Sequence, residues 1–563
     1  MLADTGDTDQ GTDLPRNWLQ RGAQVARILW RRGLGPYVRS LGFDRFLSTV
    51  HRRKEDTGTQ ELTLPQQVRL ACEELGPVAI KLAQTASSRP DVVPGEYIEE
   101  LGRLQSGVPP FSAETAREIV EAELGCAVEE AFAEFSPEPV ASASIAQVHL
   151  ATLLGGEAVA VKVQRPNLDR LVDWDLRLLG LAAREVEKRI PKAADYRPAE
   201  QVAEFGRNLR DELDFEVEGR NTDRLRAAVA LDEHVRVPWV YWELSGRRVL
   251  TQERIDGISV ADAAALDACG ADRDALASHF AASMLRQLLV VGFFHADPHP
   301  GNVFVQADGK LAMLDCGSAL GVARELQTGV AKLVLAVLEA DGQAVYEEVT
   351  ELGVVTERTD LQLLRSEVLR LMGRYAGLDT AQVSLAALVV DLFRAISASR
   401  LSVPAVFTAI LRAFLLTDGT CRALSPAFNF RDACEQVTRE RIREQLKLGN
   451  ILRELVRGVR DLDRYVHLLP RQVSELLGKA IAGGLTLRVD PVDRGDVVRR
   501  VDVMVNRLAY ALVVSGMIIG ASTILASERA VSILSAPGAV TFGIVGVLMG
   551  AHLLYSILRS GRL

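Results

Sequence analysis

The chain has 563 residues, enough for two or three domains or for one domain with large extensions. Hydrophobic residues make up 48% and charged residues 25%, so most of the chain should be packed, and a net charge of −9 argues against nucleic-acid binding as the main role. Six cysteines without a C-x-x-C pair indicate neither a disulfide framework nor a zinc site, and they suit the reduced thiols of an intracellular protein. We expect no signal peptide, because the first residues are acidic and polar.

Residues 16–54 form a basic segment that follows a polar stretch, 1–14, which we expect to be disordered. The basic segment holds ten lysines and arginines against one acid, Asp44, with apolar side chains between them. A basic amphipathic helix of this kind can lie on an anionic membrane surface. It can equally pack on an acidic part of its own chain, and the sequence does not decide between the two.

Residues 61–110 are predicted to begin with a helix that carries Lys81 and Gln84. These two residues lie three positions apart and therefore share one side of the helix. Spacing alone would make them part of a solvated face. A second helix is predicted over 111–134, with Ser112 as its N-cap.

A strand–turn–strand unit follows. Residues 140–149 lead into a strand, Gly155 and Gly156 turn the chain, and the returning strand ends in V-A-V-K at Lys162. V-A-V-K is the kinase pattern for the phosphate-binding lysine. A kinase places a glycine-rich loop before it, but no glycine occurs here between Gly125 and Gly155. Alanine and serine do not adopt positive φ without cost, so the phosphates should be held differently.

A long helix is predicted over 198–228, and it carries Glu212, Asp214 and Glu218. A kinase needs a helix carboxylate to orient its strand lysine. We choose Glu218 as the partner of Lys162. The alternative for each of these acids, considered in isolation, is an ordinary charged residue on the surface.

Two further strands, 239–242 and 249–253, are predicted to lead into a hinge. In a two-lobed kinase, backbone groups from about Glu253 to Ile255 would bond the adenine. A helical pattern over 259–294 then brings the chain to its catalytic segment.

The segment 294–317 contains the strongest chemical signal in the chain. Two short strands joined by an Asp-Gly turn form a hairpin, and Asp297, Asn302 and Asp315 flank it. Their oxygens are the ligands that Mg²⁺ on a nucleotide needs, and the order Asp-x4-Asn followed by Asp-x-Gly is that of kinase catalytic and metal loops. The alternative is a polar hairpin with surface carboxylates, but several spaced identities favour the kinase-like interpretation.

After Gly317 the chain passes directly into helical periodicity, which continues to about residue 480 without an A-P-E motif. Residues 508–526 and 538–558 then carry no charge, and each run can cross a hydrocarbon core of about 30 Å. Flanking arginines place both ends of this pair in the cytoplasm by the positive-inside rule. The alternative is a buried helical hairpin.

Together these features resemble the UbiB family, also called AarF or ABC-one type, of atypical kinases. The resemblance covers about residues 60–340, with a looser match to about 480. The motifs that carry it are E-L-G-P-x-x-I-K-x-x-Q, S-x-R-P-D, L-Q-x-x-V-P-P, A-S-A-S-I-A-Q-V-H, V-A-V-K-V-Q-R-P, E-L-D-F, H-A-D-P-H-P-G-N and D-x-G. Two departures are Ala83, where the family has Gly in K-x-G-Q, and Cys316, in place of the Phe of D-F-G.

The resemblance implies an α+β fold: an atypical protein-kinase-like two-lobed fold with a helical N-terminal extension and a C-terminal transmembrane helical hairpin. The implied parts are 1–60, a disordered start plus the basic helix; 61–135, the extension with the K-x-x-Q motif; 136–257, the N-lobe; 258–490, the helical C-lobe; and 505–560, two transmembrane helices.

The resemblance also implies catalytic roles. Lys162 would contact the α- and β-phosphates of ATP, with Glu218 orienting it. Asn302 and Asp315 would hold Mg²⁺, and Asp297 would orient the nucleophile. The residues expected to contact the nucleotide are Ala141, Ser142, Ala143, Ser144, Ile145, Ala146, Lys162, Glu253, Ile255, Asn302 and Asp315.

A regulatory role is implied for the extension, which would fold over the active site. Lys81 and Gln84 would occupy the place of a protein substrate and would meet Glu212 and Asp214. We expect His295 to brace the catalytic loop rather than to titrate in catalysis.

The leading hypothesis is a membrane-anchored, Mg²⁺-dependent ATPase or atypical kinase that supports isoprenoid quinone (ubiquinone or menaquinone) or related lipid biosynthesis. Its expected partners are a lipid or quinone-precursor substrate, the membrane and other quinone-biosynthesis enzymes, with no nucleic acid. The expected location is the inner, cytoplasmic membrane, with the kinase-like domain and both termini in the cytoplasm. The alternatives are a nucleotide-gated scaffold for membrane lipid enzymes and, with less support, a protein kinase.

Overall fold

The computed structural model describes residues 17–40, 62–87, 93–104, 109–190, 197–375, 385–434 and 436–437. All of them fall in the first of two units, Met1–Ile451. The second unit, Leu452–Leu563, contains both uncharged runs, so the predicted transmembrane hairpin lies outside the described residues. Among the helices that are described, none combines the length and the apolar character needed to span a bilayer.

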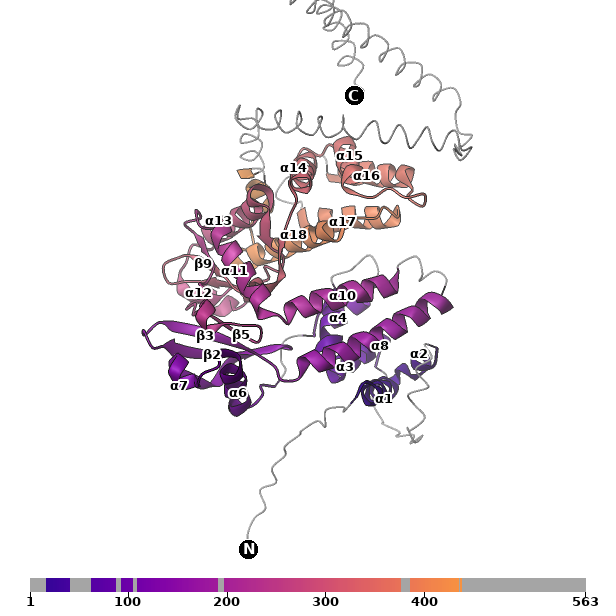
Figure 1. The fold of residues 1–563 in the computed structure, drawn as a ribbon. Coiled ribbons are helices and arrows are strands. Elements are labelled where there is room, and N and C mark those ends of the chain that lie inside the picture. Colours follow the sequence, from indigo (N-terminus) through magenta and orange to yellow (C-terminus); the bar gives the residue numbers. More distant parts are fainter. Residues whose placement is uncertain are drawn as a thin grey trace, which may run out of the picture. The chain divides into compact units, whose positions relative to one another are not determined.

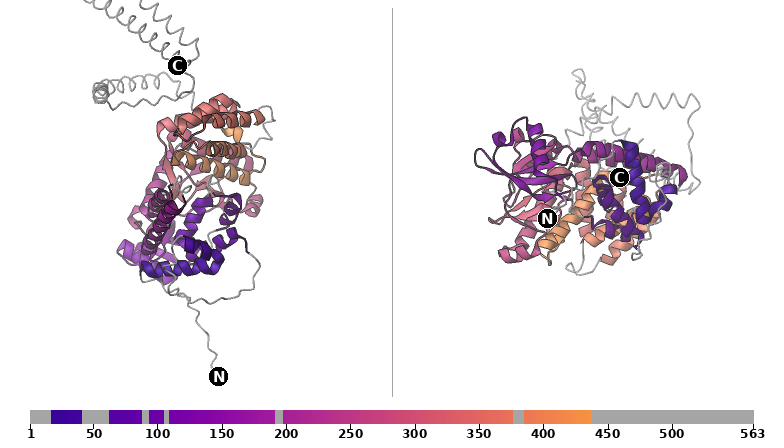
Figure 2. Two further views of the ribbon diagram at one scale, coloured as in Figure 1. Left: turned by 90° about the vertical axis from the view of Figure 1, so that its right-hand side faces the viewer. Right: turned by 90° about the horizontal axis from the view of Figure 1, so that it is seen from below.

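The N-terminal residues form a group of short helices, drawn in indigo and dark purple in Figures 1 and 2. Their bounds are α1 Trp18–Leu29, α2 Gly35–Ser40, α3 Leu64–Leu75, α4 Pro77–Ser87 and α5 Gly95–Leu101. Asn17 caps α1 by accepting a hydrogen bond from the Gln20 N–H at 2.9 Å. Gly76, with φ of 90°, separates α3 from α4, because this left-handed conformation is open to glycine and interrupts a helix.

The basic segment, as far as it is described, packs on its own chain. Helix α1 contacts α8 (Leu168–Arg189), where Arg21 donates to both carboxylate oxygens of Asp175 at 2.7 and 2.8 Å. The two side chains are only 5% and 9% exposed. Arg31 and Arg32 pair with Glu74 of α3. Of the two alternatives left open for residues 16–54, packing on the protein itself therefore describes residues 17–40.

A four-stranded antiparallel sheet forms the N-lobe, in the order β1-β2-β3-β5. The strands are β1 Phe132–Ser142, β2 Ala146–Leu153, β3 Ala158–Gln164 and β5 Val249–Glu253. Helices α6 (Ala113–Leu124) and α7 (Val128–Ala131) contact this sheet (Figure 1). Side chains alternate along a strand, so the valines of β3 enter the core with α6 while Lys162 points to the opposite face.

The start of the N-lobe differs from its prediction. The helix predicted over 111–134 ends at Leu124, because Gly125 takes the left-handed conformation with φ of 74°. Strand β1 begins at Phe132 rather than near residue 140, and Phe132 lies in the core between the sheet and α6. The N-cap prediction for Ser112 is correct: its Oγ accepts from the Thr115 N–H at 3.2 Å.

The long helix predicted over 198–228 is in fact two helices, α10 (Pro198–Glu212) and α11 (Phe215–Ala228). Leu213 is buried at the break, and the Asp214 side chain caps α11 by accepting from the Glu216 N–H at 3.1 Å. The Phe215 N–H bonds to the carbonyl of Arg247 at 3.0 Å, a contact with a distant part of the chain. The helix pattern of the sequence continues across this break, and a tertiary contact together with a cap interrupts it.

The predicted strand 239–242 is only partly present. Val240 forms an isolated bridge with Gln252, and a 3-10 turn, Trp242–Leu244, follows at once. In contrast, the strand predicted over 249–253 has the same bounds as β5. Hydrogen bonds from the Tyr241 and Glu253 N–H groups still tie the two segments together.

The C-lobe contains the hairpin predicted within 294–317 as part of a second sheet, in the order β4-β9-β8-β6. Its strands are β4 Val235–Arg236, β6 Ile258–Ser259, β8 Val303–Val305 and β9 Leu311–Met313; β7 Phe293–His295 pairs separately with β10 Ala319–Gly321. The hairpin prediction is correct, since β8 and β9 pair antiparallel. Gly309 takes φ of 78° in the turn, which glycine accepts without strain.

Helices make up the rest of the described C-lobe: α12 Ala263–Cys269, α13 Arg273–Arg286, α14 Arg324–Leu338, α15 Gly342–Leu352, α16 Leu361–Tyr375, α17 Leu385–Ala398 and α18 Ala405–Leu424. Their buried side chains and those of β8 and β9 form one continuous core. Helix α13 contacts α18, so the strands that carry the site rest on packed helices.

Candidate active site

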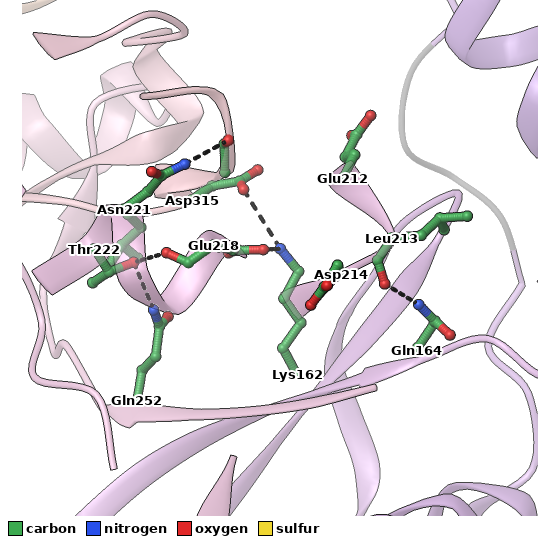
Figure 3. A network of polar contacts seen from close by, with 12 residues as sticks. Lys162, Gln164, Glu212, Leu213, Asp214, Glu218, Asn221, Thr222, Gln252 and Asp315 are labelled. Atoms are coloured by element: carbon green, nitrogen blue, oxygen red, sulfur yellow. Dashed lines mark hydrogen bonds and ion pairs between the residues drawn. The ribbon is translucent and has the colours of Figure 1, made fainter. Parts of the chain in front are cut away.

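Lys162 stands at the centre of the site (Figure 3). It lies on the face of the N-lobe sheet opposite α6, because the neighbouring valines of β3 pack against that helix. Its Nζ donates to both carboxylate oxygens of Glu218 on α11, at 2.9 and 2.8 Å, so the predicted contact is present. Asp315 approaches the same ammonium at 3.5 Å. Burial alone would lower the pKa of Lys162, but Asp315 and Glu218 outweigh it and raise that pKa, so the lysine is charged at neutral pH.

The Glu218 carboxylate is held by its surroundings as well as by Lys162. It is 7% exposed, and the hydroxyl of Thr222 donates to the Glu218 carbonyl one turn along the helix, at 2.8 Å. Gln252 of β5 in turn donates to the Thr222 hydroxyl at 3.2 Å (Figure 3). This chain of contacts fixes the turn of α11 that presents Glu218 to Lys162.

Asp315 follows β9 and has a strained backbone. Its φ of 55° is left-handed, a conformation that non-glycine residues keep mainly where the surroundings enforce it, often at functional sites. Lys162 lowers the pKa of the Asp315 carboxyl to about 2, so it is ionised at neutral pH. Its side chain is 56% exposed, which leaves the carboxylate accessible to a ligand.

Cys316, which replaces the Phe of D-F-G, lies in the C-lobe core with no exposed surface. Burial strongly raises the pKa of its thiol, which is therefore protonated and behaves as a small apolar group. Beside it, Asn221 of α11 donates to the Gly317 carbonyl at 3.2 Å. The loop is thus anchored to the same helix that carries Glu218.

The His295 ring supports the loop around Asp297 through two hydrogen bonds. The imidazole Nε2 bonds to the Leu314 carbonyl at 3.0 Å, and Nδ1 accepts from the Asp297 N–H at 3.1 Å. Burial lowers the pKa of His295, so it is neutral at neutral pH. This arrangement suits the bracing role predicted for His295.

The side-chain amide of Asn302 donates to the Asp297 carbonyl at 3.2 Å, so the amide oxygen of Asn302 is turned away from that bond.

Sequence reasoning missed Arg412, a residue of α18 whose Nη2 lies 3.0 Å from Oδ1 of Asp297. The two residues are far apart in the sequence, and nothing local indicates their contact. A signal was available in the form of an arginine within the apolar run F-T-A-I-L-R-A-F-L-L. Arg412 can therefore hold the Asp297 carboxylate in one orientation.

The alanine-rich turn between β1 and β2 is closed by the Ala143 N–H, which bonds to the Ala146 carbonyl at 2.8 Å. Arg165, also missed, donates to the Ala143 carbonyl at 2.9 Å and to Ser142 Oγ at 2.8 Å. The side chains of Ile145 and Ala146 belong to a buried core, and Ser144 is 8% exposed. Any nucleotide contact of these three residues would therefore use backbone groups, while Ala141, Ser142 and Ala143 remain predicted contacts.

The hinge offers fewer free groups than expected. The Glu253 N–H bonds to the Trp239 carbonyl at 2.8 Å, and the Arg254 N–H bonds to the Ala158 carbonyl at 3.1 Å. The Glu253 side chain pairs with Arg236. An adenine bound here would have to use other backbone groups, such as those of Ile255.

The extension reaches the site through α4. Lys81 pairs with Glu212 at the end of α10, while Gln84 donates to the Leu104 carbonyl at 3.1 Å. Asp214 caps α11, and its side chain points away from that of Glu212 (Figure 3). Of the four predicted regulatory residues, the structure therefore brings Lys81 and Glu212 into direct contact.

Ala83 replaces the family glycine on the other side of α4. It is 4% exposed and packs with Leu101 and Leu104. Its methyl group thus fits a small apolar cluster, and the substitution leaves α4 intact.

The residues present fit a metal held jointly with a nucleotide. Asp315 supplies an ionised oxygen and Asn302 an amide oxygen, which are donors that Mg²⁺ accepts. Within the described residues, no group of three or more His, Cys, Asp or Glu side chains could hold a metal alone. Phosphate oxygens would have to complete the coordination shell.

Comparisons with known proteins define the class. The family described as the ABC1 atypical kinase-like domain matches residues 103–349, and the ABC1/UbiB kinase-like C-terminal domain matches residues 493–559. The fold and the site are thus those of an atypical kinase-like protein.

Relatives narrow the class to one family. The chain is 33% identical over 407 residues to an uncharacterized protein of Synechocystis, covering 71% of each chain. It is 33% identical over 478 residues to the probable protein kinase UbiB of Xanthomonas axonopodis pv. citri, covering 82% of this chain and 86% of that protein. A Mycobacterium tuberculosis protein solved in complex with erythromycin aligns with a TM-score of 0.45 and 22% identity, over 65% of this chain and 93% of that one. The chain belongs to the UbiB family of ABC1 atypical kinase-like proteins.

Proposed function

We propose that this UbiB-family protein is a membrane-anchored, Mg²⁺-dependent ATPase or small-molecule phosphotransferase. Membership of the family is consistent with a role in isoprenoid quinone biosynthesis, and we propose a lipid or quinone-precursor substrate at the cytoplasmic membrane. A bound Mg²⁺ would neutralise charge on the transferring phosphate. Asn302 and Asp315 would hold it there.

The observation that carries the proposal is the position of Lys162. It is a charged ammonium fixed by Glu218 and placed within 3.5 Å of the ionised Asp315. Pre-positioned cations and carboxylates of this kind are what phosphoryl transfer requires, since that chemistry depends on positioning and electrostatic stabilisation. Asp297, oriented by Arg412 and by the His295 brace, would then direct a water or a substrate hydroxyl toward the phosphate.

A small substrate is favoured over a protein by the chain that follows Asp315. Strand β10 begins at Ala319 and pairs with β7, and α14 begins at Arg324. In this described stretch, no segment comparable to a kinase activation loop separates the metal loop from the helices. The Lys81–Glu212 pair also brings the extension to the edge of the site, where it would obstruct a peptide.

Asp297→Asn tests the proposal directly. We expect ATP turnover by the full-length protein to fall by about a hundredfold or more, because the group that orients the nucleophile loses its charge. Mg·ATP affinity should stay near the wild-type value, measured by calorimetry alongside phosphate release. The matched control is Asp308→Asn, in the exposed hairpin turn, which should leave both quantities unchanged. Wild-type turnover in Asp297→Asn would rule out this assignment.

The ion pair between the extension and α10 should couple to turnover. Lys81→Ala and Glu212→Ala should each change ATP hydrolysis without unfolding the protein, since both side chains are partly exposed. The double variant should show a less than additive effect, because each single change removes the same contact. Turnover measured across all four proteins gives the coupling energy, and strict additivity would show that the contact plays no part in turnover.

The membrane anchor is proposed for 508–526 and 538–558, the two uncharged runs. A protein that ends at residue 500 should leave the membrane fraction, because these runs would supply most of the insertion energy. Fractionation of cells with a high-salt wash checks this. Complete retention in the washed pellet would assign the anchor to another part of the chain or to a partner.

A further inference from the structure

A large cavity lies among the N-terminal helices, away from the candidate active site. It has a volume of about 530 Å³, within the roughly 300–1,000 Å³ typical of small-molecule sites. Its walls come from α1, α2, α3, α4, α5 and α8. Three of these helices, α3, α4 and α5, belong to the extension that reaches the active site through Lys81.

The walls of the cavity are almost entirely apolar. Val78, Ala83, Leu101 and Leu178 are typical, each at most 5% exposed. The thiol of Cys72 also lines the cavity. Burial raises the pKa of this thiol to about 11, so the thiol is neutral at neutral pH. A polar ligand group placed against such walls would lose its hydrogen bonds to water without replacement.

The two charged residues of the wall satisfy each other. Arg21 donates to the two carboxylate oxygens of Asp175 through its Nε and Nη2 groups. The Nη2 group also donates to the Leu75 carbonyl at 2.6 Å. A ligand carboxylate or phosphate would have to compete with this buried pair. The charge distribution therefore selects against an anionic ligand inside the cavity.

Two tyrosines provide the polar part of the lining. Tyr37 is 52% exposed, so it marks a side of the cavity that is open to solvent. Burial raises the pKa of the Tyr97 phenol, and the nearby Tyr37 raises that pKa further. A phenol hydroxyl can both donate and accept a hydrogen bond, so the two tyrosines suit a single small neutral head group such as a hydroxyl.

Helix α4 connects the cavity with the active site. Ala79 and Leu82 line the cavity, whereas Lys81 between them pairs with Glu212. Val78 lines the cavity too, and it shares a buried core with Ile145 of the β1–β2 turn. A ligand that orders the cavity side of α4 would therefore also order the contacts that α4 makes with the catalytic elements.

We propose that the N-terminal helices bind one single-chain aliphatic alcohol, of isoprenoid or alkyl type, and that its presence is transmitted to the nucleotide site through α4. Binding is driven by removal of apolar chain and wall from water. This site goes beyond the proposed function, and its occupancy can be measured without any turnover.

Photocrosslinking with a diazirine analogue of farnesol tests the binding. The full-length protein in phosphatidylcholine nanodiscs is irradiated with the probe, and labelled peptides are mapped by mass spectrometry. We expect labels on α1, α3, α4 and α8 that excess farnesol suppresses. Labels confined to residues 508–558, or labels that farnesol does not suppress, would overturn the proposal. A parallel phosphatidylcholine probe with a diazirine in one acyl chain should not label these helices, and equal labelling by it would overturn the single-chain assignment.

Variants that fill the cavity make the test specific. Ala79→Phe on α4 should reduce labelling by about tenfold, since the new ring takes the ligand's space. Thr85→Phe, at an exposed position of the same helix outside the lining, is the matched control and should label like wild type. If Ala79→Phe does not fold, Ala182→Phe fills the cavity from α8 instead. Undiminished labelling in a folded filling variant would overturn the proposal.

The transmission to the nucleotide site has its own measurement. Farnesol should shift the Mg·ATP affinity of the wild-type protein by about threefold or more, and this shift should disappear in Lys81→Ala while photolabelling persists. An equal shift in Lys81→Ala would show that α4 does not carry the signal through this residue. If no Mg·ATP binding is detected in any variant, the proposed function fails, while the photolabelling result still decides the cavity.

Discussion

Asp315→Asn should abolish Mg²⁺-dependent nucleotide binding and lower ATP turnover by about a hundredfold or more, an effect of the size expected when a preorganised charge is lost. The carboxylate is ionised at neutral pH because Lys162 lowers its pKa to about 2, and it is exposed enough to take a metal. The change removes a full charge but keeps the shape of the side chain. Calorimetric titration of ATP with and without Mg²⁺ measures the effect.

The control for this substitution is Asp308→Asn. Asp308 lies in the turn of the same hairpin, but it is exposed, and its contacts are with Lys310 of that turn: the Lys310 N–H at 3.1 Å and the Lys310 ammonium at 3.8 Å. The net charge changes by the same amount, so the comparison isolates the position of the carboxylate. Unchanged Mg·ATP affinity in Asp315→Asn would remove Asp315 from the metal site.

Glu218→Ala should destabilise the protein by up to about 3 kcal/mol and lower turnover by about a hundredfold. Removing one partner of a buried ion pair leaves the other charge uncompensated. Asp315 still faces Lys162, so the loss should stay at the lower end of the range for such pairs. Turnover falls because a misplaced lysine no longer fits the phosphates. Chemical denaturation and phosphate release measure the two effects.

A second substitution separates the stability effect from the catalytic one. In Glu218→Ala combined with Lys162→Met, the unpaired ammonium is gone, so part of the lost free energy of unfolding should return. Turnover should remain as low as in either single variant. If the two stability losses simply add, the ion pair seen in the structure does not contribute as a pair.

Local sequence signals predicted the parts of the site that local structure determines. The hairpin of β8 and β9 follows from short apolar runs around Asp-Gly, and β3 follows from alternation that ends at Lys162. Both features need only neighbouring residues to form. For the same reason the family motifs, which are contiguous, indicated the fold class well.

Tertiary contacts account for what the sequence did not show. The break between α10 and α11 depends on the Phe215 N–H bonding to Arg247, and a helix pattern carries no information about that contact. Arg412 reaches Asp297 from a helix far along the chain, and Arg165 closes the alanine-rich turn from the end of β3. Both arginines meet their partners only through the fold, so no local pattern indicates which residue each of them contacts.

The break between α10 and α11 also sets how much the length of this segment can vary. Glu212 and Glu218 lie on opposite sides of it, and each meets a lysine from a different part of the chain. One residue inserted within the first turn of α11 would rotate the rest of that helix by about 100° relative to the break. Glu218 would then face away from β3, although the inserted sequence could be entirely favourable for a helix. We therefore expect the spacing from Glu212 to Glu218 to tolerate substitutions between its ends far better than insertions or deletions.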